Sequence, residues 1–374
     1  MRVLLFIDSF VVGGAQRQFL NLAEGLQNNA NAIHVCTYYP LNELLLQSTC
    51  AFSVECFKKK SRFDLSPALK LGASIRVFKP DVVVAFLSTP CVYAELSRLT
   101  GHAVPIIASE RNGPVSGCRR LVQSVFFPLH LLASRVVFNN ESYKDLLAKR
   151  FPPVRSKSTL IYNGVDKQYF QQERDTGKSD SLTGKQVNKN FRFCAVSARP
   201  TLEKGIFDLI NAADYVRARL STPFTIDWIG PYNHFPEEAE AAKQLITKLD
   251  LQEIWYWKGN SNGMEIAYKG YDAMLVPSHR EGLSNVLCEA MATGLPSVVT
   301  DIADHQLIIG DSDSGIVCEP GNYKSFGKGM LQITGLERSE LKRMGENARA
   351  FAVENFSMEK YVQNWEKVIG DVIR

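Results

Sequence analysis

The chain has 374 residues, enough for about two domains at roughly 150 residues each. Apolar residues make up 45% of it, charged residues 22% and aromatic residues 10%, a composition that excludes disordered and fibrous proteins. The net charge of +4 is too small to indicate a nucleic-acid-binding protein. The charge is uneven, because residues 1–170 carry 20 basic against 11 acidic residues and residues 171–374 carry 23 against 28. The N-terminal half is therefore the basic one.

Apolar runs of strand length alternate with longer amphipathic stretches, which is the pattern of a parallel sheet with helices on both faces. The predicted fold class is therefore α/β. In the first half the predicted strands are 3–7, 32–39, 81–87, 104–109 and 135–140, with helices between them.

Residues 171–190 contain almost no apolar side chains, so they cannot bury a face and are expected to form a linker. The alternation then resumes, which predicts a second α/β domain. Residues 358–373 place apolar side chains on one stripe and predict a terminal amphipathic helix. In the second domain the predicted strands are 191–198, 224–230, 254–259, 273–278 and 296–300, and the predicted helices are 206–219, 236–249 and 284–293.

The eight cysteines form no CxxC pair and have no histidine at a spacing typical of a zinc site. We expect them to be free and mostly buried thiols in a reducing compartment. The apolar N-terminus is interrupted by Asp8 and lacks a cleavage site, and no uncharged apolar stretch reaches about 18 residues. The expected location is the cytoplasm.

Two glycines, Gly13 and Gly14, follow the first predicted strand and precede a helical pattern that begins near Ala15. Glycines at such a turn allow close approach of a ligand, and the helix N-terminus offers N–H groups to an anion. The full G-x-G-x-x-G fingerprint of dinucleotide-binding folds is absent. A tight turn without a ligand is the alternative that these residues leave open.

Two cations follow the predicted strand 191–198, where Arg199 stands at the strand end and Lys204 five residues later. Gly205 then opens a helix. Ligands of parallel sheets bind outside the carboxyl ends of the strands, so these two side chains suit an anionic ligand such as a phosphate. Two solvated surface charges are the alternative.

Two carboxylates, Glu281 and Glu289, lie eight residues apart around a helix expected to start near Ser284. Both can face one cleft, and carboxylates accept hydrogen bonds from sugar hydroxyls. The backbone N–H groups of Leu283, Ser284 and Asn285 would point at an anion. A capping acid and an incidental helical glutamate are the alternative.

Taken together, these residues resemble the retaining GT-B glycosyltransferases of family four, which transfer a hexose from a nucleotide diphosphate sugar. The resemblance implies two Rossmann-like domains that face each other across a cleft. Residues 1–170 would bind the acceptor, 171–190 would be the linker, 191–355 would bind the nucleotide sugar, and 356–374 would pack back on the first domain. The matching motifs occur in this order: Gly13-Gly14, Asn163-Gly164-Val165-Asp166, Arg199 with Lys204-Gly205, Glu281 to Glu289, and Gly294-Leu295-Pro296.

The resemblance also implies a role for each residue. Arg199 and Lys204 would hold the donor diphosphate and stabilise the leaving nucleotide, and Glu281 would accept hydrogen bonds from the donor sugar. Glu289 would bind the ribose hydroxyls. The resemblance implies that the enzyme needs no cofactor and no metal ion. The remaining donor contacts would be the backbone amides of Leu283, Ser284 and Asn285 and the glycines Gly13 and Gly14.

Many members of this family carry a histidine in the region that here reads I-I-A-S-E-R-N. Glu110 and Arg111 occupy it in this chain and become candidates for contact with the sugar or the acceptor. The S-E-R-N sequence resembles the members that build bacterial surface glycans such as O-antigen, lipopolysaccharide and capsule from hexose or N-acetylhexosamine donors. This similarity favours a UDP-sugar as the donor.

Residues 117–135 combine Arg119, Arg120 and Arg135 with several large apolar side chains, and Lys58-Lys59-Lys60 adds a second basic cluster. A basic and apolar helix can lie in a membrane interface. A buried helix with basic ends is the alternative. The expected acceptor is accordingly a lipid-linked saccharide, which the protein would bind at the cytoplasmic face of the membrane.

The predicted function is a metal-independent, retaining hexosyltransferase that acts on a lipid-linked saccharide. A nucleotide-sugar epimerase of the same fold is one alternative, and it would need no acceptor. A non-catalytic, membrane-docked nucleotide-sugar-binding protein is the other. The expected partners are a nucleotide sugar, a lipid-linked acceptor and the membrane, and no nucleic acid.

Overall fold

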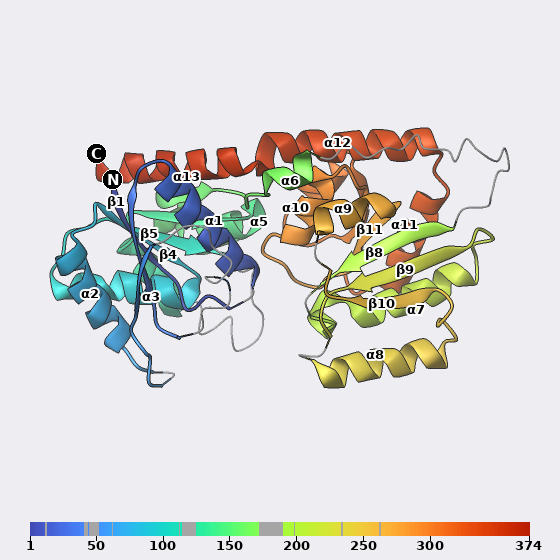
Figure 1. Cartoon of the computed structure of the whole chain (residues 1–374), viewed down its shortest axis with the longest axis horizontal. Helices are drawn as coiled ribbons and strands as arrows, with labels where there is room; N and C mark the ends of the chain where they lie inside the picture. Colours follow the sequence, from blue (N-terminus) through green and yellow to red (C-terminus); the bar gives the residue numbers. More distant parts are fainter. Residues whose placement is uncertain are drawn as a thin grey trace. The chain divides into compact units, whose positions relative to one another are not determined.

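A computed structural model describes the chain except for residues 12, 41–43, 45–51, 62, 112, 114–124, 172–189, 198, 233–234 and 262. The chain divides into two compact units (Figure 1). Unit 1 comprises Met1–Gly164 and Met358–Arg374, and unit 2 comprises Val165–Ser357. Unit 1 ends before the boundary expected at residue 170, because the backbone N–H of Val165 donates to the carbonyl of Phe356 at 2.7 Å. The expected linker falls almost wholly outside the described residues.

Unit 1 contains a seven-stranded parallel sheet in the order β3-β2-β1-β4-β5-β6-β7. Its central strands are entirely buried, as expected for a sheet covered on both faces. The strands are β1 (Arg2–Phe6), β2 (Ala32–Thr37), β3 (Ser53–Cys56), β4 (Val82–Phe86), β5 (Ile106–Glu110), β6 (Arg135–Phe138) and β7 (Ser158–Leu160).

Helices cover both faces of this sheet. Alternate strand side chains such as Leu5 and Val84 pack with α1 and α13, and the others, such as Leu4 and Val83, pack with α2, α3 and α5. The terminal helix α13 therefore belongs to the core of unit 1, although unit 2 separates it from the rest in sequence. The bounds are α1 (Gly14–Asn28), α2 (Ser66–Phe78), α3 (Ser88–Ser97), α5 (Glu141–Arg150) and α13 (Met358–Ile373).

Unit 2 contains a six-stranded parallel sheet in the order β10-β9-β8-β11-β12-β13. Counted from the first strand of the unit, this is the 3-2-1-4-5-6 order of a Rossmann fold. The strands are β8 (Phe191–Val196), β9 (Phe224–Ile229), β10 (Trp255–Gly259), β11 (Ala273–Val276), β12 (Ser297–Thr300) and β13 (Gly315–Cys318).

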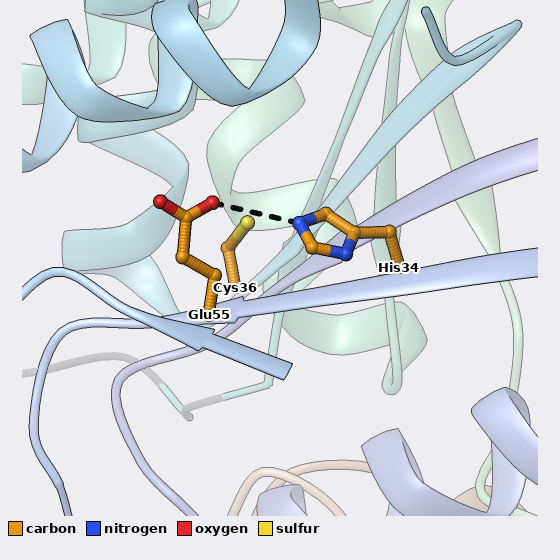
Figure 2. A group of neighbouring side chains, drawn as sticks. All are labelled: His34, Cys36 and Glu55. Carbon is orange, nitrogen blue, oxygen red and sulfur yellow. Dashed lines mark ion pairs between the residues drawn. The ribbon is translucent and has the colours of Figure 1, made fainter. Parts of the chain in front are cut away.

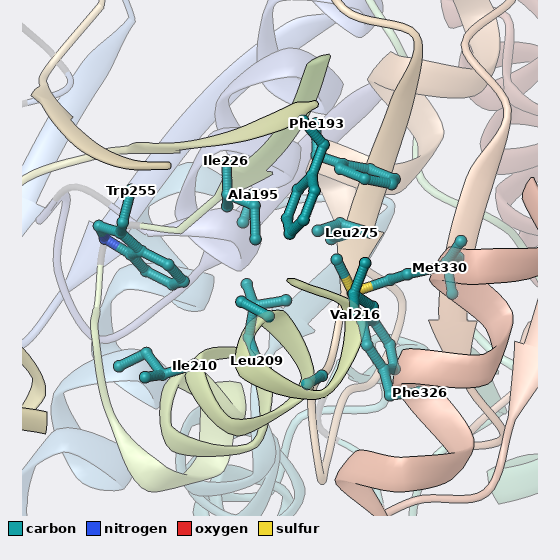
Figure 3. Close-up of a cluster of buried hydrophobic side chains, with 14 of the residues drawn as sticks. Phe193, Ala195, Leu209, Ile210, Val216, Ile226, Trp255, Leu275, Phe326 and Met330 are labelled. Carbon is teal, nitrogen blue, oxygen red and sulfur yellow. The ribbon is translucent and has the colours of Figure 1, made fainter. Parts of the chain in front are cut away.

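One face of the unit 2 sheet carries the main core of that unit. Figure 3 shows Phe193 and Ile226 of the sheet packed with Leu209 of α7 and with Met330 of α11. The predicted helices 206–219, 236–249 and 284–293 are present as α7, α8 and α10. The bounds are α6 (Lys167–Phe170), α7 (Ile206–Arg217), α8 (Pro236–Lys248), α9 (Met264–Ala267), α10 (Asn285–Ala292), α11 (Tyr323–Thr334) and α12 (Arg338–Phe356).

The α/β class and the Rossmann-like architecture are confirmed, and three edge strands were missed. Two of them, β3 and β7, are short and contain several polar residues, so they lack the apolar run that marks a central strand. The third, β13, has four residues and follows a polar turn. Pairing with a neighbouring strand, rather than local sequence, defines such elements.

The predicted helix 117–135 lies outside the described residues as far as position 124. Its described part contains a short 3-10 helix, η3 (Phe127–Leu131), and not a continuous α-helix. His130, within this 3-10 helix, is buried. Within the described parts of the chain, none of the helices is both long and apolar enough to span a bilayer.

Candidate functional site

The candidate site of unit 2 lies where the strand order reverses. Strands β8 and β11 are neighbours in the sheet, and the chain leaves them toward opposite sides. Their carboxyl ends open a crevice that binds ligands in folds of this kind. The loop after β8 carries Arg199 and Lys204, and the loop after β11 carries Glu281. The residues that the sequence singled out thus follow the two strands at this point of the sheet.

Gly205 lets the two loops touch. Its φ angle is +69°, a left-handed conformation that favours glycine, and it immediately precedes α7. A Cβ atom at this position would lie 1.9 Å from the carbonyl oxygen of Pro277, in the loop after β11. The contact therefore requires glycine for two independent reasons, and it fixes the neighbouring Lys204 against the second loop.

Lys204 and Glu281 form an ion pair between the two loops. Lys204 Nζ lies 2.6 Å from Glu281 Oε1, and the side chains are 20% and 11% exposed. The hydroxyl of Ser278 donates to the same carboxylate oxygen at 2.9 Å. Because the pair is only partly buried, both charged groups stay accessible to a ligand at the strand ends.

Further contacts between the loops surround this pair. The backbone N–H of His279 donates to the carbonyl of Glu203 at 2.9 Å, and the Arg280 guanidinium donates to the Glu203 carboxylate at 2.9 Å. The imidazole of His279 is also paired with Asp208 on α7. The loops therefore form one connected surface, which holds Lys204 and Glu281 in a defined arrangement.

The helix that follows Glu281 begins as the sequence predicts. Ser284 is the N-cap of α10 and Asn285 its first residue. Glu289 lies one turn into this helix and is half-buried. Burial, followed by the charge of Glu289, raises the pKa of the Tyr268 hydroxyl well above its ordinary value, so this phenol stays neutral beside the carboxylate. Tyr268 is a neighbour of Glu289 that no sequence motif indicated.

The structure does not bring Arg199 into contact with the ion pair. Its side chain is exposed, and its hydrogen bonds are made by backbone atoms, with Ser197 and Thr201 as partners. The guanidinium is therefore placed to meet a ligand from solvent. It belongs to the site by its position after β8 and not by a contact with Lys204 or Glu281.

A buried histidine behind the Glu281 loop was not identified from the sequence. His305 is fully buried, and its Nδ1 atom hydrogen-bonds to the carbonyl of Thr300 at 2.8 Å. Burial lowers the pKa of His305, and the nearby charge of Glu281 opposes that effect. The imidazole is thus neutral at neutral pH, with Nδ1 as the donor, and the side chain lies within the electrostatic reach of Glu281. A lone histidine in the sequence carries no signal for such a position.

The glycine pair of unit 1 lies where the sequence places it, between the first strand and the first helix. Gly14 is the first residue of α1, and Gly13 precedes it in an extended conformation. Asp8, at the end of the strand, accepts hydrogen bonds from the Ser9 N–H at 2.7 Å and from the Gln16 amide at 3.1 Å. Burial raises the pKa of Asp8. Asp8, Ser9 and Gln16 thus form a hydrogen-bonded polar group beside the turn, at the carboxyl end of β1.

Arg111 of unit 1 is buried and has partners within that unit. Its guanidinium donates to the hydroxyl of Ser109 at 2.8 Å and to Asn163 Oδ1 at 3.1 Å. It also lies over the rings of Phe86 and Trp365, 4.6 and 5.4 Å from their centroids. These contacts join the sheet to α13, so Arg111 has a structural position in unit 1.

Glu110 is likewise buried in unit 1. It accepts a hydrogen bond from the Ser88 hydroxyl at 2.7 Å and lies 3.6 Å from His130 Nε2. The other ring nitrogen of His130 lies 2.6 Å from the carboxylate of Glu95. Contact of Glu110 or Arg111 with a sugar or an acceptor stays a prediction.

Two family models match the chain, Glycosyltransferase Family 4 over residues 12–169 and Glycosyl transferases group 1 over residues 180–351. The chain is 24% identical to the UDP-Gal:alpha-D-GlcNAc-diphosphoundecaprenol alpha-1,3-galactosyltransferase of Escherichia coli, with 97% of this chain and 95% of that protein covered. It is 33% identical to the N-acetyl-alpha-D-glucosaminyl L-malate synthase of Bacillus anthracis, over 35% of this chain and 34% of that protein.

The fold is shared with a solved structure, Anabaena HepE in complex with UDP and glucose. The TM-score is 0.80 at 19% identity, and the match covers 98% of this chain and 99% of HepE. The two family models match successive parts of the chain and together cover most of the sequence. Each matched part contains a parallel Rossmann-like sheet. The chain therefore belongs to the GT-B glycosyltransferases that combine a family 4 domain with a group 1 domain.

Proposed function

We propose that this glycosyltransferase moves a hexose or an N-acetylhexosamine, with retention of configuration, from a UDP-sugar to a hydroxyl of a lipid-linked saccharide in surface-glycan assembly. The observation that carries the proposal is the Lys204–Glu281 pair at the switch point of unit 2. Glu289 follows it on α10 as a second carboxylate for hydroxyl groups.

In the proposed reaction, the bond between sugar C1 and the diphosphate oxygen breaks while the acceptor oxygen bonds to C1 on the same face. The proton of the acceptor hydroxyl passes to the departing diphosphate oxygen. Negative charge then develops on the leaving nucleotide. Lys204 and Arg199 supply cations for that charge, and the amides of Leu283, Ser284 and Asn285 supply N–H groups near the start of α10. Because protein cations meet the diphosphate, we propose that no metal ion or other cofactor is required.

The two carboxylates have separate roles in this proposal. Glu281 accepts hydrogen bonds from hydroxyls of the donor sugar, and Glu289 binds the ribose hydroxyls. Gly13 and Gly14 allow the first domain to approach the diphosphate closely.

The names of the similar proteins support the choice of donor and acceptor. The E. coli relative is named for transfer of galactose from UDP-Gal to a GlcNAc-diphosphoundecaprenol acceptor. HepE was solved with UDP and glucose. Both names contain a uridine nucleotide, and the E. coli name alone adds a lipid-linked sugar acceptor.

A nucleotide-sugar panel tests the proposal, first by thermal shift and then by mass spectrometry of the best donor with a lipid extract. A ligand that binds the native state raises the apparent melting temperature. We expect one UDP-sugar to stabilise the protein and to lose its sugar to a lipid-linked glycan, in the presence and absence of EDTA. NMR of the product should show the anomeric configuration of the donor. Sugar interconversion without acceptor would instead establish an epimerase, and binding without turnover would establish a binding protein.

We propose that the basic N-terminal half contacts the membrane. Two exposed apolar surfaces of unit 1 support this proposal. On α2 and just before it, Phe63, Leu65, Leu69 and Val77 are between 60% and 86% exposed. The same segment, residues 58–79, carries five exposed basic residues, namely Lys58, Lys60, Lys70, Arg76 and Lys79. Around η3, the large apolar side chains of Val125, Phe126, Leu131 and Leu132 are also exposed. Apolar side chains among cations suit an anionic lipid surface.

Co-sedimentation with vesicles tests this contact. We expect salt-sensitive binding to vesicles containing anionic phospholipid and weaker binding to neutral vesicles. Val77→Asp should weaken binding, while Val353→Asp, at an exposed position on α12 of unit 2, should leave it unchanged. Equal vesicle binding by the two variants would show that α2 does not contact the membrane.

A further inference from the structure

Three side chains that commonly bind metal ions lie together at one edge of the unit 1 sheet. His34 and Cys36 lie two positions apart on β2, and Glu55 lies on the edge strand β3 (Figure 2). Cys36 pairs directly with Glu55 in the parallel register, and side chains two residues apart on a strand share a face. One ligand atom from each of the three residues lies within 4.8 Å of the other two.

Neighbouring hydroxyls orient two of these three side chains. His34 Nδ1 lies 2.7 Å from the hydroxyl of Ser53, the residue directly opposite it on β3. With Nδ1–H donating to that oxygen, the lone pair of Nε2 faces Glu55, whose carboxylate is 3.6 Å away. Glu55 in turn accepts a hydrogen bond from Ser74 of α2. A metal-binding histidine usually donates its second nitrogen in this way, and metal-binding carboxylates are themselves hydrogen-bonded.

We propose that His34 Nε2, Cys36 Sγ and the Glu55 carboxylate bind one zinc ion or a similar transition-metal ion, with water as the fourth ligand. Nitrogen, thiolate sulfur and carboxylate oxygen are the zinc ligands of proteins. In a tetrahedral zinc site the nitrogen and oxygen ligands are about 3.4 Å apart, close to the separation of Nε2 and Oε2 here. Cys36 is fully buried beneath the site, whereas Glu55 is half exposed, so one side stays open to water.

Binding would convert the Cys36 thiol to a metal-bound thiolate and release its proton to solvent. The ion would connect β3, an edge strand of four residues, to β2. It would therefore raise the stability of this edge of unit 1. The rival interpretation is a plain ion pair between His34 and Glu55, which needs no metal.

Titration of the full chain with Co²⁺ distinguishes these interpretations, because a cobalt–thiolate bond gives a charge-transfer absorption band. We expect one band that saturates at one Co²⁺ per chain, is abolished by excess Zn²⁺ and is accompanied by a higher melting temperature. The matched variants are Cys36→Ala and Cys56→Ala. Cys56 follows Glu55 on β3, so its side chain points to the opposite face of the sheet.

Cys36→Ala should abolish the band, and Cys56→Ala should retain it. His34→Gln should weaken cobalt binding by more than about tenfold. This variant provides the test if Cys36→Ala does not fold, since the His34 ring is partly exposed. A wild-type protein without the band at saturating Co²⁺ would overturn the proposal. So would a band that persists in Cys36→Ala or an unchanged affinity in His34→Gln.

Discussion

Lys204 Nζ lies 2.6 Å from Glu281 Oε1, although the two residues are 77 positions apart in the chain. The pair joins the loops that follow two neighbouring strands, β8 and β11. Each side chain thereby restricts the other, and a ligand that binds there meets a cation and a carboxylate in fixed positions.

Removing the cation should stop sugar transfer. Lys204→Ala deletes a positive charge expected to offset the charge on the leaving nucleotide, and loss of one such group typically costs about 100-fold or more in kcat. Steady-state kinetics with the identified UDP-sugar measure the effect. Arg217→Ala, on the exposed side of α7 and paired with Asp214, is the control and should retain activity. Near-normal turnover by Lys204→Ala would refute the assigned role.

Removing the carboxylate should also stop transfer while leaving the protein folded. Glu281→Ala removes the acceptor for sugar hydroxyls and leaves Lys204 and Ser278 without this partner. We expect a loss of kcat/KM of at least about 100-fold, and a loss of only about 1 kcal/mol in the free energy of unfolding, because the pair is partly exposed. Urea unfolding and kinetics separate the two effects. A variant with full activity, or one that does not fold, would contradict this prediction.

Gly205→Ala should be destabilising, because the added Cβ meets the Pro277 carbonyl and the φ angle is positive. The expected cost is roughly 2–4 kcal/mol, together with reduced kcat/KM through displacement of Lys204. Gly370→Ala is the matched control, since no atom lies within 4 Å of its added Cβ and the residue lies in α13. It should gain about 0.5–1 kcal/mol. Equal thermal stability of the two variants would show that the loop contact is not tight.

Stability should depend on pH through the buried cluster of His130, Glu95 and Glu110. Burial alone lowers the pKa of His130, but the hydrogen bond that its Nδ1–H donates to Glu95 and the charges of both carboxylates raise it above 6.5. Burial also raises the pKa of Glu95. Because the pKa of His130 is higher in the folded than in the unfolded state, protonation of His130 stabilises the folded protein. This stabilisation is fully present below pH 6.5 and is lost as the pH rises through the folded-state pKa.

Urea unfolding at pH 6 and pH 8 checks this expectation. The free energy lost in His130→Gln relative to the wild type should be larger at pH 6 than at pH 8. His102→Gln is the control with the opposite sign, because burial lowers the pKa of His102 and its contribution is lost as the pH falls. If both variants respond to pH in the same direction, the cluster does not govern the dependence.

Trp365→Ala should strongly destabilise unit 1. The indole is fully buried, stacks on Phe86 with centroids 5.4 Å apart, and lies under the Arg111 guanidinium. Loss of a buried tryptophan typically costs about 3–5 kcal/mol. Lys367→Ala, at an exposed position of the same helix, should stay within about 0.5 kcal/mol of the wild type. Thermal unfolding of both variants measures the difference.

Central elements were predictable because their sequence periodicity is strong. The buried run of β4 and the amphipathic stripe of α13 were both found from their patterns alone. The edge strands β3 and β7 were not, since three or four mixed residues carry no period and become strands only by pairing with β2 and β6. Tertiary pairing therefore supplies what local sequence lacks.

The candidate site was predictable where residues occupy fixed places after a strand. Arg199, Lys204 and Glu281 all follow the carboxyl ends of parallel strands, so their common edge could be inferred. The influence of Glu289 on Tyr268 and of Glu281 on His305 could not be inferred, because these two buried residues belong to other segments of the chain. The burial of Arg111 against Trp365 was equally invisible, as it depends on α13.

The place of α13 has a consequence for synthesis on the ribosome. Unit 1 starts at Met1 but needs Met358–Arg374 to complete its core, and the 193 residues of unit 2 are translated in between. At about 5–20 residues per second, this interval lasts about 10–40 s. During that time the sheet surface that receives Trp365 has no cover from its own helix, whereas unit 2 is a continuous segment. The second unit can therefore finish folding first, while the first unit completes its core only after Trp365 has been synthesised.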